Sequence, residues 1–145
     1  MVGADVPEPL RQAVRKRARG GCECCLTSEV LSGIRCQTDH ITLRARHGVT
    51  TAENLCLACV TWNGHKHAQT RARDPAAREA EPLFHPRQHS WDEHFVWNVE
   101  GAEIIGLTPT GCATVVALNM NDPLIVGARA LWVGFGAHPP PRQSS

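Results

Sequence analysis

Apolar and polar positions at the start of the chain follow a helical period. Leu10, Val14 and Arg17 fall on one stripe of the segment PLRQAVRKRARG, whose other positions are mostly charged or small. The pair Gly20-Gly21 follows this stripe, and glycine is common just beyond the end of a helix. The pattern therefore predicts a basic amphipathic helix that ends near these glycines.

Two short extended segments and a helix are expected next. Residues 34–41 (IRCQTDHI) have β-branched ends and no helical period, and residues 55–60 (LCLACV) form a second apolar stretch. The loop TLRARHGVTTAEN separates them. Residues 61–73 (TWNGHKHAQTRAR) predict a short helix, so the order of elements is ββα.

The second half of the chain predicts a linker, a pair of strands and two helices. Pro, Ala and charged residues in 72–83 indicate the linker, and residues 83–107 contain two extended segments that turn at Glu100-Gly101. Thr108-Pro109 and Asp122-Pro123 each combine an N-cap residue with a proline suited to the first helical position. Helices are therefore expected over 108–120 and 122–135.

These elements predict an α+β protein in three parts. Residues 1–73 hold the basic N-terminal helix and the ββα core, residues 74–138 form a strand and helix extension packed on the core, and residues 139–145 form a disordered tail. Aromatic and cationic residues between 85 and 97 are expected to build core rather than to stack on bases, with Arg87 and His89 the most exposed of them.

The distribution of charged residues suggests a polyanionic partner. The first 73 residues carry 11 Lys and Arg against 6 Asp and Glu, and the remainder carries 4 against 8. A basic half suits a nucleic acid, although a solvated helix surface would have the same charges. The apolar run ALWVGFGA is too short to span a membrane and the start MVGADVPEPL lacks a secretion signal, so a cytoplasmic protein without a membrane partner is expected.

The cysteines point to a metal. Seven cysteines crowd mainly into the basic half of a chain without an export signal, which favours metal ligation over disulfides. Cys22 and Cys25 form one CxxC pair, and Cys56 and Cys59 form another, a spacing that suits zinc.

The run from Cys22 to Lys66 resembles the HNH endonuclease family, whose core is a ββα-metal (His-Me) finger that is often pinned by a cysteine quartet around zinc. Asp39-His40, Asn54 and Asn63 stand at the positions of the family pattern. The segments LFHPRQHSWDEHFVWN and IIGLTPTGCATVVALNMNDP are similar to the C-terminal region of a group of bacterial HNH proteins.

The resemblance implies a role for each of these residues. His40 would be the general base that deprotonates water, and Asp39 and Asn63 would offer oxygen ligands to a catalytic Mg²⁺ or Mn²⁺. Asn54 would act indirectly, because its amide can bond the loop backbone and fix His40. The expected substrate is double-stranded DNA.

Four cations are candidates for contact with that substrate. Each of them has surface solvation as its alternative. The candidates are Arg17, Arg44, Arg46 and Lys66.

The sequence departs from the family pattern in two places. The second cysteine pair should begin at Cys59 and end at position 62, where this chain has Trp62. Cys56 could complete a zinc quartet with Cys22, Cys25 and Cys59, another nearby donor such as Cys24 or His65 could do so, or zinc could be weak or lost. In the loop, Leu43 replaces the usual proline, and His47-Gly48 replaces a Gly-Gly pair, where a positive φ would strain a non-glycine residue.

The sequence thus predicts a metal-dependent endonuclease that hydrolyses DNA phosphodiester bonds. One alternative is a catalytically degenerate, zinc-containing module that binds nucleic acid without cutting it. A second is a structural or interaction domain whose metal serves only folding.

Overall fold

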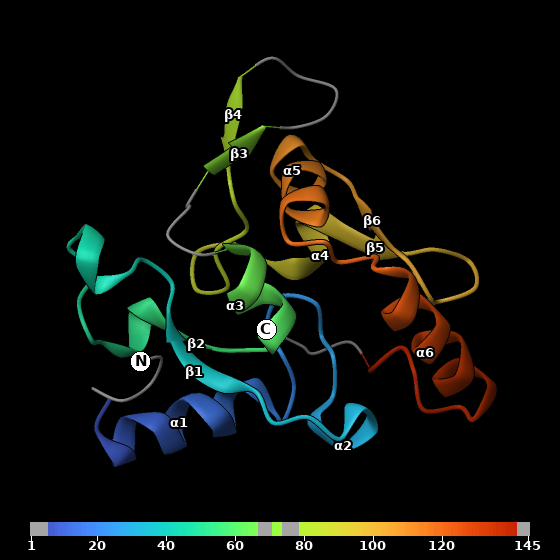
Figure 1. Ribbon diagram of the computed structural model, residues 1–145, viewed down its shortest axis with the longest axis horizontal. Coiled ribbons are helices and arrows are strands. Elements are labelled where there is room, and N and C mark those ends of the chain that lie inside the picture. The colour runs from blue at the N-terminus through green and yellow to red at the C-terminus, as the bar shows by residue number, and fades with distance from the viewer. Residues whose placement is uncertain (1–5, 67–70, 74–78, 142–145) are drawn as a thin grey trace.

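A computed structural model describes residues 6–66, 71–73 and 79–141. This part of the chain mixes short helices with three two-stranded antiparallel sheets, in agreement with the predicted α+β class (Figure 1). None of its helices is both long enough and apolar enough to cross a membrane.

The first half of the chain folds as a helix, a hairpin and a second helix. Helix α1 (Glu8–Ala18) buries Val14 and packs on strand β2 (Leu55–Ala58). Strand β1 (Gln37–His40) pairs with β2 from Gln37 opposite Ala58 to His40 opposite Leu55. Helix α3 (Val60–Lys66) follows β2 directly and lies on the other side of the hairpin from α1 in Figure 1. The predicted order ββα is therefore present, with shorter strands than expected.

Three further short elements lie in the connections of this half. Each is only three or four residues long, so the hydrophobic pattern of the sequence did not predict it. They are helix α2 (Glu29–Ser32) and the 3₁₀ turns η1 (Arg44–Arg46) and η2 (Ala52–Asn54).

The prediction for residues 61–83 was wrong in its second part. Helix α3 ends at Lys66, and residues 71–73, expected to be helical, form strand β3 (Arg71–Arg73). Strand β4 (Ala80–Pro82) pairs with it inside the stretch expected to be a linker. Residues 67–70 and 74–78 lie outside the described residues. The two strands are short and polar, so they lack the hydrophobic alternation that would predict a strand. Their pairing depends instead on tertiary contacts.

The second half contains the predicted strand pair and two helices, but part of the stretch 83–107, expected to be extended, forms a short helix. Helix α4 (Trp91–His94) leads into strand β5 (Phe95–Trp97), which pairs with β6 (Ile104–Gly106) across a turn where Gly101 has a φ of 76°. The Thr108 side chain accepts a hydrogen bond from the Gly111 N–H at the start of α5 (Pro109–Ala117).

Helix α6 (Pro123–Gly134) begins in the same way. The Asp122 side chain accepts from the Leu124 N–H, as the N-cap prediction required. The described part of the predicted tail, residues 139–141, has no helix or strand, and residues 142–145 lie outside the described range.

One apolar cluster joins the two halves. Leu55, Leu57 and Trp62 from the hairpin and α3 pack in the same cluster as Phe95 and Ile104 from the second sheet. The aromatic residues between 85 and 97 thus build core, as predicted.

The expectation that Arg87 is exposed was wrong. Its guanidinium forms a largely buried ion pair with Glu23. Glu23 also accepts a hydrogen bond from the Leu57 N–H at 2.9 Å. Arg87 therefore connects the second half of the chain to the cysteine-bearing loop and to β2.

Candidate functional site

The Asp39-His40 pair lies at the very end of strand β1. Asp39 pairs with Cys56, and His40, the last residue of the strand, pairs with Leu55. Both side chains are buried, with 7% and 8% of their surface exposed. The Asp39 carboxylate accepts a hydrogen bond from the His40 N–H at 3.0 Å, so one of its oxygens is engaged locally.

The imidazole of His40 is held by a hydroxyl from the loop. Its Nε2 atom lies 2.8 Å from Thr50 Oγ1, within hydrogen-bonding distance. Thr50 follows η1 in the chain, so the contact folds the loop back onto the strand end. The sequence offered no signal for Thr50, because a loop threonine has no distinguishing pattern until the loop closes.

Asn54 bonds the loop backbone on both sides. Its Oδ1 accepts from the Thr42 N–H at 2.9 Å, and its Nδ2 donates to the carbonyls of Thr42 at 2.9 Å and Val49 at 2.8 Å. The Ile41 N–H also donates to the Asn54 carbonyl at 2.7 Å. These bonds are the ones expected of a residue that fixes the loop, whereas its indirect part in catalysis stays a prediction.

The loop itself contains the strained backbone that the sequence suggested. His47 has a φ of 69°, in the left-handed region, where the family pattern has glycine. A Cβ atom at Gly48 would overlap the carbonyl oxygen of Thr42. The loop conformation therefore depends on Gly48 and tolerates His47 at a cost.

Lys66 faces the protein interior rather than solvent. Only 3% of it is exposed, and its Nζ donates to the Ile41 carbonyl at 2.5 Å. Burial raises the pKa of Asp39 and lowers that of Lys66, and in each case the attraction between the two opposes the shift. This burial argues against the predicted role of Lys66 as a surface contact for nucleic acid.

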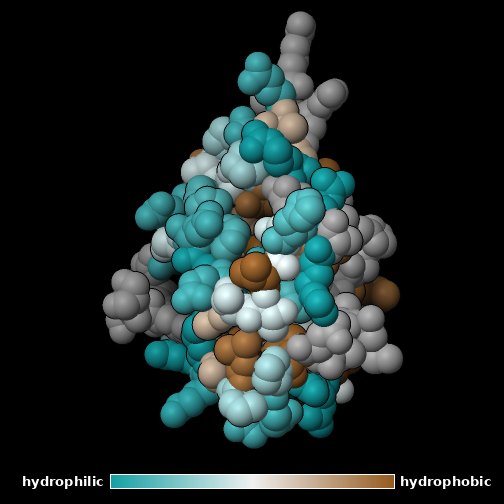
Figure 2. Space-filling view, turned by 90° about the vertical axis from the view of Figure 1, so that its left-hand side faces the viewer, coloured by the Kyte–Doolittle hydropathy of each residue, from teal (hydrophilic) through white to brown (hydrophobic). Residues whose placement is uncertain are grey.

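The arginine candidates divide in the same way. Arg17 donates to the Ala52 carbonyl at 3.0 Å and the Leu55 carbonyl at 2.7 Å, so its guanidinium holds η2 and the start of β2. That arrangement argues against a contact with nucleic acid. Arg44 and Arg46 are exposed on η1. The face of the molecule on this side is mostly hydrophilic (Figure 2), and their contact with nucleic acid stays a prediction.

Asn63 lies in α3, the helix that follows the β1–β2 hairpin in the chain. Its side chain lies outside the described part of the structure. Its role as a second oxygen ligand therefore stays a prediction.

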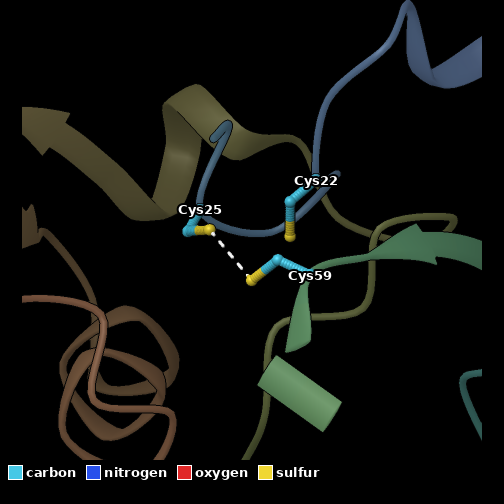
Figure 3. A group of neighbouring side chains, drawn as sticks. All are labelled: Cys22, Cys25 and Cys59. Carbon is cyan, nitrogen blue, oxygen red and sulfur yellow. Dashed lines mark hydrogen bonds between the residues drawn. The ribbon is translucent and has the colours of Figure 1, made fainter. Parts of the chain in front are cut away.

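A cluster of three thiols forms beneath the hairpin. The sulfur atoms of Cys22, Cys25 and Cys59 all lie within 4.8 Å of one another, and they point toward a common centre (Figure 3). Cys25 and Cys59 sulfurs are 3.6 Å apart. Two thiolates bound tetrahedrally at a Zn–S distance of about 2.3 Å lie roughly 3.8 Å apart. The cluster can therefore bind a metal ion such as zinc.

Cys56, predicted as a fourth zinc ligand, is not among the three clustered thiols. Cys56 lies within β2 opposite Asp39, whereas Cys59 lies one residue beyond the strand. Residues directly opposite in a strand pair share one face of the sheet, so Cys56 lies beside Asp39. Its neighbours are instead charged groups: burial raises the pKa of Cys56, Asp39 adds to that rise, and Lys66 and Arg17 oppose it.

Trp62 stands where the family pattern has the fourth cysteine. Its side chain is buried, and its indole Nε1 has no hydrogen-bond partner among the described residues. Trp62 lines an apolar cavity of about 100 Å³ together with Cys25, Cys59 and Cys36. The tryptophan therefore supplies bulk and not a ligand at this position.

The three thiols differ in their acidity. Hydrogen bonds from Cys22 and Cys59 hold the pKa of Cys25 well below its ordinary value, and the Thr27 hydroxyl, 3.1 Å from its sulfur, contributes to the same effect. Burial raises the pKa of Cys22. Cys25 is therefore the first of the three to ionise, and thiolates are the form that binds metal. Thr27 could have been suspected from its place two residues after Cys25.

Comparisons of this chain with protein-family models, with curated proteins and with solved structures found no match. The geometry of the strand end and of the thiol cluster is thus the basis for assigning a function.

Proposed function

We propose that this protein is a metal-dependent endonuclease of the HNH type that hydrolyses phosphodiester bonds of double-stranded DNA. The observation that carries the proposal is the strand end, where Asp39 and His40 stand side by side, Thr50 holds one nitrogen of His40, and Asn54 fastens the adjoining loop. An ordinary surface Asp-His pair would need none of these supports.

His40 acts as the general base in this proposal. With the Thr50 hydroxyl accepting a hydrogen bond from Nε2–H, the neutral imidazole has its lone pair on Nδ1. Nδ1 takes a proton from water as the water oxygen bonds to phosphorus and the bond from phosphorus to the leaving oxygen breaks. The leaving oxygen takes its proton from solvent. Histidine is the side chain that most often serves as a general base.

Asp39 and Asn63 would hold a Mg²⁺ or Mn²⁺ ion, which would supply positive charge to the phosphate in the transition state. The carboxylate of Asp39 fits that role because one oxygen remains beyond the His40 N–H bond. Burial raises the pKa of Asp39, so a cation beside it would offset the cost of its charge.

Cleavage of supercoiled plasmid tests the proposal. Protein freed of Mg²⁺ and Mn²⁺ is assayed with each ion added back, beside His40→Ala and a His47→Asn control at an exposed loop position. We expect ion-dependent nicking by the parent and the control, and a loss of about 10²–10⁴-fold in His40→Ala. Nicking that survives in His40→Ala would refute His40 as the base.

A second candidate, a zinc-containing module that binds nucleic acid without cutting it, is favoured by the thiol cluster. In that case the parent protein leaves plasmid intact and binds DNA with an affinity that falls steeply with salt and is unaffected by His40→Ala.

A further inference from the structure

A cavity of about 230 Å³ lies beside the strand end and is bounded by both halves of the chain. Ile41 and Thr42, the two residues after His40, line it on one side, and His85 and His89 line it on the other. Its volume is several times the roughly 30 Å³ that a water molecule occupies in the liquid, so a phosphate group can enter with water around it.

The protein backbone fixes the tautomers of both imidazoles in this cavity. The His85 N–H donates to Nδ1 of His89 at 2.9 Å, and the Arg87 N–H donates to Nδ1 of His85 at 3.1 Å. A ring nitrogen that accepts a hydrogen bond carries no proton. The remaining nitrogen, Nε2, therefore carries the proton in each neutral ring.

This arrangement selects the kind of ligand. A metal ion needs the lone pair of a ring nitrogen, and in both rings that lone pair already accepts a hydrogen bond from a backbone N–H. Each ring therefore has its Nε2–H as a donor, and both residues line the cavity. Burial lowers the pKa of His85, in keeping with a neutral donor. The ligand must accept hydrogen bonds.

The surrounding charges favour an anion. Lys66 and Arg71 both line the cavity, and no Asp or Glu does so among its described lining residues. Arg71 is exposed, and one of its terminal nitrogens donates to the Ala80 carbonyl at 2.9 Å, which leaves the rest of the guanidinium for other partners. Two neutral donors and the exposed guanidinium of Arg71 match the oxygens of a phosphate, while the buried Lys66 ammonium, bonded to the Ile41 carbonyl, adds positive charge behind the cavity wall.

We propose that this cavity binds a phosphate group through His85 and His89, with Arg71 at its rim. Its position indicates which phosphate. Thr42, whose N–H and carbonyl are both bonded to Asn54, joins the cavity wall to the loop that holds His40. A nucleic-acid backbone phosphate near the bond to be cut would fit there. The assignment of the phosphate to a nucleic acid rests on the proposed function, whereas the inference of a phosphate site does not.

Nitrogen-detected NMR of the histidine side chains tests the site directly. Full-length protein, with no Mg²⁺ or Mn²⁺ added, is titrated with inorganic phosphate and, separately, with a short DNA duplex. We expect shifts of the Nε2 signals of His85 and His89, while His138, buried against Trp97 and Trp132, serves as the unperturbed reference. Phosphate affinity should fall about tenfold in His89→Ala, the loss of one hydrogen bond to a charged group.

Two further variants separate a donor from a structural effect. His89→Gln retains an N–H near the Nε2 position and should recover most of the affinity that His89→Ala loses. Arg71→Gln should weaken phosphate binding severalfold, whereas Arg35→Gln, at an exposed site outside the cavity, should not.

The outcomes distinguish this inference from the endonuclease proposal. Nε2 shifts caused by phosphate in a protein that cuts no DNA would support the site and leave the endonuclease refuted. Shifts with free phosphate but not with DNA would support the site and exclude the nucleic-acid source. No shift of either histidine with either ligand, or equal affinity in His89→Ala, would overturn the inference.

Discussion

Thr50 contacts one nitrogen of His40 through its hydroxyl, and in the proposed function this contact leaves the other nitrogen for chemistry. The 2.8 Å contact joins Nε2 to Oγ1, and the loop that carries Thr50 is fastened by Asn54. At the scale of single residues, the site is therefore a chain of supports in which each side chain fixes the next. The sequence indicated Asn54 and His40, because their types and spacing matched a known pattern, but it did not indicate Thr50.

Replacing Thr50 tests that chain of supports. Thr50→Val keeps the shape but removes the hydroxyl, so His40 can change tautomer. We expect nicking to fall about 10–100-fold, as when the partner of an oriented imidazole is removed. Thr50→Ser, which retains the hydroxyl, should keep most of the activity. A pH–rate profile separates this positioning role from a loss of folding, since the acidic limb should move in Thr50→Val. Equal rates and profiles in Val and Ser variants would contradict it.

At the scale of elements, the loop between β1 and β2 combines two unlike positions. Gly48 has no room for a Cβ atom, while His47 adopts a positive φ despite its side chain. The first position is fixed by close packing against the Thr42 carbonyl. The second carries conformational strain that the surrounding bonds hold in place.

Substitutions at these two positions should have opposite effects. Gly48→Ala forces the loop away from Thr42, and we expect the free energy of unfolding to fall by about 1–3 kcal/mol. His47→Gly removes the cost of the left-handed conformation, about 1–2 kcal/mol, and adds about 0.5–1 kcal/mol of backbone entropy, so stability should be unchanged or slightly higher. Urea unfolding measures both. A Gly48→Ala protein as stable as the parent would contradict the packing described.

The thiol cluster also acts at the scale of elements, because it connects the loop after α1 to the end of β2. Cys59→Ser should lower bound zinc well below one ion per chain and make the unfolding temperature insensitive to chelators. Cys56→Ser should leave zinc content at the parental value, because Cys56 lies opposite Asp39 and away from the cluster. Metal analysis beside thermal unfolding gives both readings. A loss of zinc in Cys56→Ser would restore the quartet suggested by the CxxC spacing.

The two cysteines show how far sequence reasoning reaches at this scale. The spacing indicated a metal cluster and named three of its members correctly. It also added Cys56 to the cluster, because the position of a cysteine relative to the other thiols depends on where β2 ends, and strand ends are set by pairing with β1. The same limit explains β3 and β4. Their pairing, Arg71 opposite Pro82, joins segments that have no strand signal of their own.

At the scale of the whole molecule, polar contacts join the two halves of the chain in addition to the shared apolar core. Arg87 reaches back to Glu23, and the indole of Trp91 donates to the Cys24 carbonyl at 2.8 Å. Arg129, from α6, is 1% exposed and lines the cavity beside Cys25. The second half therefore covers the thiol loop, and motifs read one half at a time do not predict such contacts.

His138 adds a pH dependence to this assembly. Its ring is buried between Trp97 and Trp132, with centroids 4.5 Å and 5.8 Å away, and Nε2 has no hydrogen-bond partner among the described residues. Burial, and then the nearby Arg129, lower the pKa of His138 below its ordinary 6.5. Between the lowered value and 6.5, the unfolded chain binds a proton that the folded chain does not.

Stability should therefore be complete above about pH 6.5 and fall as the pH drops toward the folded-state pKa. The pKa values of His85 and His94 are also lowered, mainly by burial, and act with the same sign. His138→Phe keeps an aromatic ring between the tryptophans and removes the titrating group. Urea unfolding from pH 5 to 8 should show a shallower dependence of stability on pH in this variant than in the parent. Parallel slopes in the parent and His138→Phe would mean that His138 is protonated equally in the folded and unfolded chains, and would exclude it as a source of acid sensitivity.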